Sequence, residues 1–328
     1  MRRGRGTMAR AGPAAQGREV RRARALRSFP RMTQGRNRLI GTLFVAIAAT
    51  LWGLMGPVTR TALAEGLHPL EVALWRALIG AALFAVHAAV TRKVHIDRGD
   101  RLMVAAFGVV GVAGLLASYS QAVDAGGAAL AAILLYTAPV WVALLSAAFL
   151  GERITRRVVL ALALATAGVA GIALSGGGGI RISPAALGWG LLSSVAYAMY
   201  YLFGKRYFER YTTATLFIYA LPIGALTFLP FVDFRPKSGT AWAALVFLGA
   251  VPTYLSYVFY SAGLKRIEAT RAATVATVEP VVAAIGAYFM WNERLSPVGY
   301  ACAAVVLLGV LLMVAGPSRT TQDEPPHP

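Results

Sequence analysis

Long apolar runs separated by short polar segments dominate the chain between residues 39 and 315. A helix needs about 20 mainly apolar residues to cross a bilayer, and ten runs fit that length. The runs are continuous rather than alternating, which favours helices over the strands of a membrane barrel. The predicted spans are Leu39–Val58, Leu70–Val90, Leu102–Val123, Ala128–Leu150, Val158–Leu174, Ala185–Phe203, Ala214–Val232, Ala241–Leu264, Ala272–Trp291 and Val298–Ala315.

The composition agrees with this pattern. Hydrophobic residues make up 57% of the chain and charged residues 14%, and the mean hydropathy is +0.61. A soluble fold of 328 residues could not bury so much apolar surface. Gly and Ala are frequent within the runs, which allows helix backbones to approach closely in lipid. The sequence therefore predicts an all-α integral membrane protein of ten transmembrane helices, with no soluble domain.

The net charge of +18 is concentrated in the N-terminal tail, where residues 1–38 hold 12 Arg and one Glu. No apolar core of a signal peptide follows these charges before Leu39. One interpretation is a disordered basic arm for anionic lipid or RNA. We favour a cytoplasmic topology signal, or a translation start at Met8 or Met32, the latter of which leaves residues 1–31 outside the protein. No nucleic-acid partner is predicted.

Basic residues in the loops predict the orientation of the chain. With the N-terminus inside, the inner segments hold 26 Lys and Arg and the outer loops hold 5. Without the N-terminal tail the inner segments still hold 14. Cytoplasmic loops carry such an excess. We therefore predict a multi-pass protein of a bacterial-type inner membrane, with both termini cytoplasmic.

An internal repeat appears when Gly108–Leu174 is laid over Gly249–Ala315, which align without a gap. Fifteen of the 67 positions are identical, among them Pro139 with Pro280 and Tyr119 with Tyr260. Each half then holds five helices, an odd number, so the halves have opposite orientations. Inverted repeats are typical of secondary transporters with a central site. The predicted parts are a tail (1–38), a first repeat (39–174), a Gly-rich linker (175–184), a second repeat (185–315) and a tail (316–328).

Several short motifs occur in a fixed order along the chain, and the last two of the first half recur in the second half. They are Leu51–Gly53, Arg76, Ala138–Pro139, Gly151–Arg153, Glu279–Pro280 and Asn292–Arg294. In these motifs the chain resembles paired EamA domains of the drug/metabolite transporter superfamily, from Leu39 to about Ala315. Asn292 stands where members usually have Gly, and Tyr197–Ala198 where they often have Trp-Ala. The resemblance implies a carrier of small metabolites, mostly an exporter of amino acids and similar solutes, with a cavity between the halves.

Glu279 is the sharpest candidate for chemistry. It lies near the middle of the ninth span, where an ionisable group costs at least about 2.5–3.5 kcal/mol on insertion scales. Such a group faces a cavity or a partner, and small residues at helical spacing leave room for a ligand. We predict a proton-carrying or substrate-orienting carboxyl. The alternative is a structural carboxyl that caps backbone groups freed by Pro280.

Pro139 and Pro280 interrupt helices at matching positions of the two halves. Carbonyls that lose their partner in a bilayer must face protein, water or substrate. Matched interruptions are the best sequence indication of a central transport site. Simple packing kinks are the alternative, and both interpretations can hold together.

Arg76 lies about two turns inside the second span, next to Trp75. It could bind a substrate carboxylate as a bidentate fork, or pair with Glu279 or Glu71. We favour a structural pairing or a side chain that snorkels to the outer headgroups, with Trp75 as an interfacial anchor.

Aromatic residues in the spans could stack on a planar substrate or hold its ammonium group. We place Trp52, Tyr136, Tyr197 and Tyr254 in the substrate pathway, because they lie deep in their spans and need a polar partner there. Tyr201 and Tyr260, near the cytoplasmic ends, are expected in an interfacial belt. Threonines of the ninth span form a stripe that intrahelical bonding explains equally well; they are Thr270, Thr274 and Thr277.

Two Glu-Arg hairpins, at Glu152–Arg153 and Glu293–Arg294, are expected to tie helices together on opposite faces of the membrane. No cofactor or metal is predicted, because Cys302 is the single cysteine and the four histidines are far apart in sequence. The expected partners are a small-molecule substrate, the lipid bilayer and, as a further candidate, protons. The protein is expected to be a monomer or a homodimer.

The predicted function is export of a small, amino-acid-like metabolite by alternating access, with proton coupling as one option. An uncoupled facilitator and a drug, nucleobase or sugar carrier of the same fold remain open. A membrane enzyme would need a cluster of His, Asp or Ser at an interface, and the sequence indicates none. A non-transporting scaffold is the less favoured alternative, because the repeat and the midplane carboxyl count against it.

Overall fold

The computed structural model describes residues 35–175, 181–292 and 294–315. The chain forms two units, Met1–Ile40 and Gly41–Pro328, and the second contains the helical bundle. Ten helical segments of 18 to 30 residues are long and apolar enough to span a membrane, and the described ranges contain no strand. The prediction of an all-α membrane fold with ten spans is confirmed. Residues 1–34 and 316–328 of the predicted tails, and residues 176–180 of the predicted Gly-rich linker (175–184), lie outside the described residues, whereas residues 35–38 of the N-terminal tail are helical.

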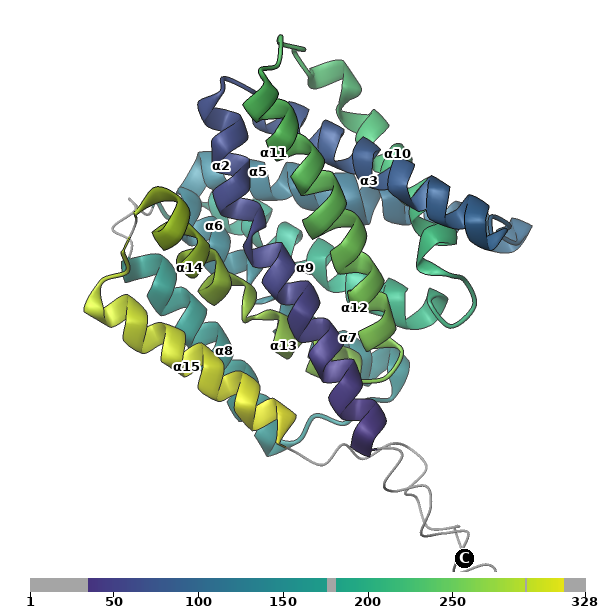
Figure 1. Ribbon diagram of the computed structural model, residues 1–328. Coiled ribbons are helices and arrows are strands. Elements are labelled where there is room, and N and C mark those ends of the chain that lie inside the picture. Colours follow the sequence, from purple (N-terminus) through teal and green to yellow (C-terminus); the bar gives the residue numbers. More distant parts are fainter. Residues whose placement is uncertain (1–34, 176–180, 293, 316–328) are drawn as a thin grey trace, which may run out of the picture. The chain divides into compact units, whose positions relative to one another are not determined.

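The first half of the chain supplies five spans (Figure 1). His68 begins the second of them by accepting a hydrogen bond from the Leu70 N–H at 3.3 Å, with Pro69 in the first turn. The first span is the helix from residue 35 that ends in α2 (Met55–Ala64), and the second is α3 (Pro69–Thr91). The third consists of η1 (Arg98–Asp100), α4 (Arg101–Ala106), η2 (Phe107–Gly114) and α5 (Leu115–Gly126). The fourth is the pair α6 (Ala128–Leu135) and α7 (Ala138–Leu150), and the fifth is α8 (Arg156–Ser175).

The second half supplies five more. Four of its helices begin at a serine or threonine whose hydroxyl accepts a hydrogen bond from the first turn, as Ser183 does for Ala186 at 3.1 Å. The sixth span is α9 (Pro184–Tyr207), and the seventh is α10 (Thr213–Phe228) with η3 (Leu229–Phe231). The eighth consists of α11 (Gly239–Gly249), η4 (Ala250–Leu255) and α12 (Ser256–Leu264). The ninth is the pair α13 (Ala269–Ala276) and α14 (Glu279–Trp291), and the tenth is α15 (Pro297–Val314).

Two spans are broken at matching positions. α6 and α7 are separated by two residues, and so are α13 and α14. Pro139 and Pro280 lie in the first turn of the second half-helix, where a missing N–H removes no intrahelical bond. The interruptions are therefore full breaks rather than kinks. Both broken spans end in a left-handed residue, Gly151 with φ 70° and Asn292 with φ 51°, and Asn is one of the few residues that replace Gly in that conformation.

Helices α8 and α15 cross at a pair of glycines that the repeat relates. A Cβ on Gly168 would lie 2.8 Å from the Cys302 carbonyl and the Val306 N–H nitrogen. A Cβ on Gly309 would lie 2.8 Å from the Ala161 carbonyl and the Ala165 nitrogen. In the alignment of the two repeats, every residue of the first contact corresponds to a residue of the second: Gly168 to Gly309, Cys302 to Ala161 and Val306 to Ala165. The inverted repeat of the sequence is therefore a pseudo-two-fold contact in space.

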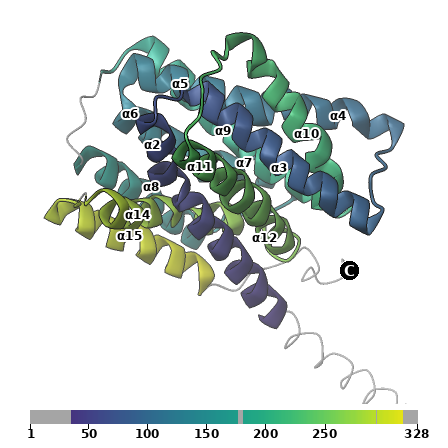
Figure 2. The same cartoon turned by 45° about the horizontal axis from the view of Figure 1, so that its top comes forward.

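The same symmetry relates a second pair of helix contacts. Gly80 of α3 packs against Thr253, and Gly224 of α10 packs against Val112; a Cβ on either glycine would lie within 2.7 Å of the neighbouring side chain. Thr253 and Val112 occupy equivalent positions of the repeat, and both lie in π-helical segments, η4 and η2. The π turns widen the third and eighth spans where another helix approaches closely. Figure 2 shows α3 and α10 side by side, as in Figure 1.

Substitution of the two crossing glycines tests the pseudo-two-fold contact. Gly168→Ala and Gly309→Ala are expected to lower the thermal unfolding midpoint by similar amounts, because each methyl group meets backbone atoms that cannot move away. The expected cost is about 1–3 kcal/mol for either variant. Gly188→Ala is the matched control, since a Cβ there meets no atom within 4 Å. A loss confined to one of the two glycines would contradict their equivalence.

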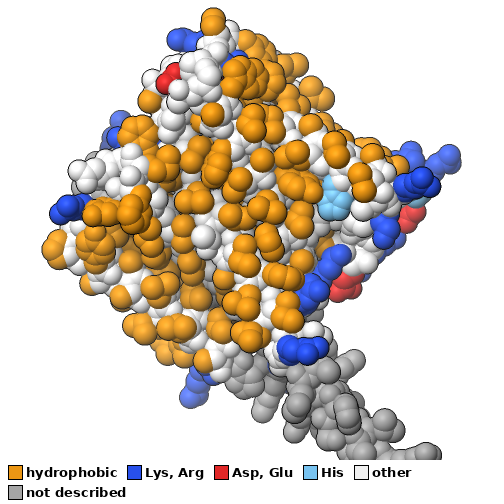
Figure 3. Space-filling view, viewed as in Figure 1, with side chains coloured by type: hydrophobic (Ala, Val, Ile, Leu, Met, Phe, Trp, Pro, Cys, Tyr) orange, Lys and Arg blue, Asp and Glu red, His pale blue; other side chains and the backbone are white. Residues whose placement is uncertain are grey.

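The outer surface of the helices is apolar. Figure 3 shows hydrophobic side chains across the face turned to the viewer, with the charged side chains at its edges. Large side chains such as Leu102 and Phe289 are 81% and 80% exposed. A protein in water does not expose so extensive an apolar face, and a lipid environment accounts for it. With the ten spans, this makes the chain a multi-pass membrane protein.

A central cavity between the two repeats

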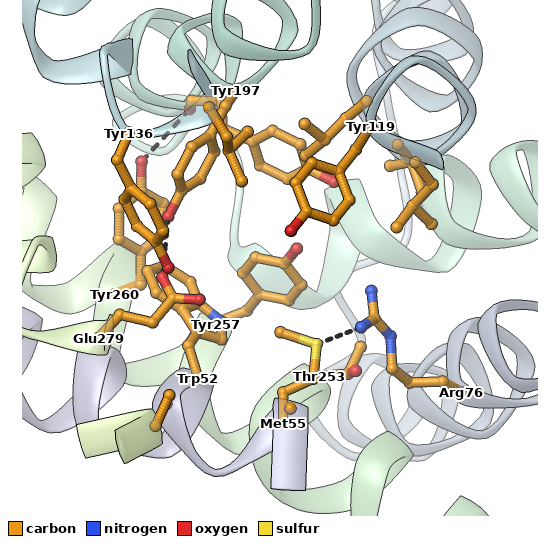
Figure 4. A pocket seen from close by; sticks show the side chains of 18 of the residues that line it. Trp52, Met55, Arg76, Tyr119, Tyr136, Tyr197, Thr253, Tyr257, Tyr260 and Glu279 are labelled. Carbon is orange, nitrogen blue, oxygen red and sulfur yellow. Dashed lines mark hydrogen bonds between the residues drawn. The ribbon is translucent and has the colours of Figure 1, made fainter. Parts of the chain in front are cut away.

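Helices of both repeats enclose a cavity of about 440 Å³, within the range of small-molecule sites. Tyrosines, one carboxylate and one guanidinium provide most of its polar groups (Figure 4). The first repeat contributes Trp52, Met55, Arg76, Tyr119 and Tyr136, and the second contributes Tyr197, Tyr200, Tyr201, Thr253, Tyr257, Tyr260 and Glu279.

Glu279 stands where the ninth span is broken. It is the first residue of α14, it is half-buried, and the Tyr197 hydroxyl donates to its Oε2 at 3.3 Å. The N-terminus of a helix stabilises negative charge, because its first N–H groups have no intrahelical acceptor. The corresponding residue of the first repeat is Ala138. The carboxylate therefore gives the cavity a chemical asymmetry that the backbone lacks.

Aromatic rings form one continuous wall. The ring centroid of Trp52 lies 5.3 Å from that of Tyr260 and 5.8 Å from that of Tyr257, and Tyr257 is stacked on Tyr200 at 6.1 Å. Tyr201 and Tyr260 are each 1% exposed and line the cavity. Their expected place in an interfacial belt is therefore wrong: the hydroxyls lie inside the protein because helices α9, α12 and α13 pack around them.

Arg76 lines the cavity as well. Its Nη1 contacts the sulfur of Met55, and Figure 4 shows the guanidinium directed toward Met55. The snorkelling interpretation is therefore wrong. A pairing with Glu71 is also wrong, because Glu71 binds the Lys237 ammonium at 2.5 Å. Trp75 packs on that ammonium, 5.2 Å from its ring centroid, so Trp75 serves the ion pair.

One predicted pathway residue, Tyr254, and one predicted helix interruption, Pro139, do not line the cavity. Tyr254 is absent from the cavity wall; its hydroxyl is 3.1 Å from His87 Nδ1 and its ring is 4.8 Å from that of Phe84. Pro139 is buried in the first turn of α7, whereas Pro280 lines the cavity. The structure thus brings together Glu279, Trp52, Tyr136, Tyr197, Arg76 and Pro280.

The cavity is closed toward one face, which we name the Glu152 face after the residue that anchors it. The Glu152 carboxylate accepts hydrogen bonds from the Ala269 N–H at 2.7 Å and from the Thr270 N–H and hydroxyl at 3.1 and 2.6 Å. It thereby caps the N-terminus of α13 and lets this helix start ahead of the predicted apolar run. Every residue of α13 is buried. The Glu152–Arg153 hairpin thus joins the first repeat to the second; Glu293 lies outside the described residues.

Other contacts close the same face. The Lys205 ammonium donates to the carbonyls of Leu264 and Ile267 at 3.0 and 2.8 Å. In the neighbouring loops, Arg210 pairs with Asp100 at 2.9 Å, and the Tyr211 hydroxyl donates to Asp100 at 2.6 Å. The bond to Asp100 raises the pKa of Tyr211 to about 12. The contacts of Arg210 and Tyr211 with Asp100 join the second repeat to the first on this side, whereas the Lys205 contacts lie within the second repeat.

Two of the three threonines of the stripe in the ninth span bond within their own helix, whereas the Thr270 hydroxyl bonds Glu152. Thr274 donates to the Thr270 carbonyl at 2.9 Å, and Thr277 donates to the Thr274 carbonyl at 2.6 Å. These bonds support the predicted intrahelical alternative. They also leave the hydroxyls less available for a substrate.

Sequence reasoning missed Tyr119, Met55 and Thr253 as cavity residues. The repeat carried a signal for two of them. Tyr119 is the counterpart of Tyr260, and Thr253 is the counterpart of Val112, and all four line the cavity. Positions that the pseudo-two-fold relates therefore face the same space.

The fold and the cavity define a class of protein: a membrane transporter built from two inverted five-helix repeats. The model of the EamA-like transporter family matches residues 39–174 and 184–315. The chain belongs to this family.

Known proteins similar to the chain carry transporter names. An uncharacterized transporter of Archaeoglobus fulgidus is 30% identical over 83% of this chain and 95% of its own length. A probable terminal-alkyne amino-acid exporter of Streptantibioticus cattleyicolor is 27% identical over 82% of this chain and 91% of its own. A crystal structure shares the fold with a TM-score of 0.73 and 21% identity, covering 83% of this chain and 95% of the solved one.

Proposed function

We propose that the protein exports a small amino-acid-like metabolite by alternating access. The observation that carries the proposal is a cavity with a carboxylate at a helix break, enclosed by both repeats and closed toward one face. A scaffold protein would have no reason to keep such a space open, since interiors are otherwise closely packed. The name of the Streptantibioticus cattleyicolor relative supports an amino-acid substrate.

The orientation we propose places the Glu152 face in the cytoplasm. The excess of Lys and Arg in the loops of this face, together with the basic tail, supports it. Both termini are then cytoplasmic, in a bacterial-type inner membrane. The described conformation is then closed to the cytoplasm, and transport requires the repeats to rock so that the Glu152 face opens.

Glu279 is the proposed coupling residue. A carboxylate at this position can hold a proton or a cationic group of the substrate, and competition between the two would link their movements in opposite directions. The neighbouring tyrosines, among them Tyr136 and Tyr197, would serve both states, because a hydroxyl can donate to a carboxylate or accept from a carboxylic acid.

Counterflow into proteoliposomes tests the proposed function. Vesicles loaded with an unlabelled amino acid are expected to accumulate the labelled one saturably when they contain the protein, and not when they lack it. A panel of the common amino acids covers acidic, basic, aromatic and aliphatic side chains. Exchange without dependence on a pH gradient would indicate an uncoupled facilitator. If no amino acid exchanged, the proposed substrate class would be wrong, and sugars, nucleobases and drugs would be tested next.

A further inference from the structure

The cavity carries one cation and one anion on different walls. Figure 4 shows Arg76 beside Met55 on one side and Glu279 beside Tyr136 on the other. Among the described residues that line the cavity, no other side chain is charged. No ion pair joins the two in the described part of the chain. The cavity is therefore a site with two separated poles.

The guanidinium of Arg76 has donors to spare. Its Nη1 contacts only a thioether, which is a weak acceptor, and its Nε has no acceptor within the described structure. Glu71 of the same helix is taken by Lys237. An arginine in a membrane-spanning helix normally has an anionic or carbonyl partner. A carboxylate from the substrate would supply it, because the planar fork of arginine matches a carboxylate with two parallel hydrogen bonds.

The opposite wall suits an ammonium group. Glu279 supplies the negative charge, and the rings of Trp52, Tyr136 and Tyr197 line the cavity with it. Aromatic faces attract cations, and the attraction grows when water is excluded. Val112, Leu115 and Leu221 also line the cavity and offer an apolar surface to a hydrocarbon chain.

We propose, building on the proposed transport function, that the preferred substrate is an ω-amino carboxylate, with its carboxylate on Arg76 and its terminal ammonium on Glu279. In an α-amino acid both charged groups sit on one carbon, so the molecule engages one pole and leaves the other unpaired. Several methylene groups between the charges let one molecule reach both walls. Such a substrate is neutral overall, as is the pair of side chains that binds it.

A chain-length series in wild-type proteoliposomes tests the proposal. The labelled probes are glycine, β-alanine, γ-aminobutyrate, δ-aminovalerate and ε-aminocaproate, and the readout is the apparent affinity in counterflow. The affinity is expected to rise with length to an optimum at least about tenfold above glycine, since the longer molecule gains one charge-assisted bond that glycine cannot make. An affinity that is flat along the series, or highest for glycine, would overturn the proposal.

The role of Arg76 is tested by Arg76→Gln and Arg76→Lys. Arg76→Gln is expected to weaken competition by the optimal ω-amino acid about tenfold, while competition by the n-alkylamine of equal length stays unchanged. Arg76→Lys is expected to recover part of the loss, because it keeps the charge but not the fork. The control is Arg235→Gln, which removes a positive charge from an exposed loop. Equal losses for amine and amino acid would refute carboxylate binding at Arg76.

The outcomes separate the two proposals. Exchange of α-amino acids with no gain along the series would leave the transport function standing and refute the two-pole substrate. If neither the common amino acids nor the series exchanged, the proposed function would be wrong, and the two-pole substrate would fall with it. The series uses the wild-type protein alone, so a folding defect of a variant cannot decide the result.

Discussion

Replacing Glu279 by glutamine is expected to reduce counterflow of the exchanged amino acid at least about tenfold, because a charge-assisted bond to the ammonium group is lost. Glutamine has nearly the same shape and still accepts the hydrogen bond that Tyr197 donates to Oε2. The remaining flux is expected to respond less to an imposed pH gradient than wild-type flux does. The measurement is counterflow of the labelled substrate, with and without the gradient.

Tyr254→Phe is the matched control for this experiment. It removes a hydroxyl from a span that contributes to the cavity, but Tyr254 bonds His87 and does not line the cavity. Its flux and pH response are expected to equal those of the wild type. Wild-type flux and coupling in Glu279→Gln would refute both proposed roles of the carboxyl and assign Glu279 to structure. Reduced flux with an unchanged pH response would keep it as a substrate contact alone.

The asymmetry of the two repeats explains why one carboxyl can have so large an effect. The backbones are closely related: breaks, π turns and crossing glycines all recur at equivalent positions of the two repeats. Glu279 nevertheless lines the cavity, whereas Ala138, at the related position of the first repeat, does not. A symmetric frame suits alternating access, because rocking exposes equivalent ends of the site. An asymmetric charge suits recognition, because a substrate with two different ends then has one preferred direction.

The fold could be predicted from the sequence because the bilayer imposes a strong local rule. Any helix that crosses it needs an apolar run, and each of the ten runs became a span. The ends were harder to place, since they depend on long-range contacts. Ala269 and Thr270 of the second repeat begin α13 because Glu152 of the first repeat caps them.

The candidate site could be predicted only in part. Glu279 stood out because a charge within a span is costly wherever it points. Tyrosines give no such signal, because a ring is equally at home in a cavity, in the core or at the interface. Which way Tyr254 and Tyr260 face depends on the rotation of the helix around its axis. Neighbouring helices set this rotation, and it was misjudged for both from depth alone.

Arg76 shows the same limit for a charged residue. The sequence offered two acidic partners, and the structure gives one of them, Glu71, to Lys237 from a loop of the second repeat. Because Glu71 pairs with the distant Lys237, the Arg76 guanidinium remains available to a ligand in the cavity. A local pattern could not have distinguished the two arrangements.

Replacing Glu152 by alanine is expected to open the Glu152 face. The substitution leaves the N–H groups of Ala269 and Thr270 without their acceptor, and a buried unsatisfied group costs about 1–3 kcal/mol. The state in which this face is open does not need those bonds, so its population is expected to rise about tenfold or more. The measurement is maleimide labelling of Thr277→Cys, a position only 1% exposed in the closed state. The background is Cys302→Ala, which matches Ala161 of the first repeat.

The labelling also tests the proposed orientation. A membrane-impermeant maleimide is expected to react faster in Glu152→Ala than in its parent when applied from the cytoplasmic side, in inverted vesicles. Glu209→Ala is the control, because it removes an exposed carboxylate from the same face without touching α13. Equal labelling of the Glu152 variant and its parent would show that the cap does not hold the face closed. Faster labelling from the opposite side alone would show that the Glu152 face lies outside the cytoplasm, and would reverse the proposed direction of transport.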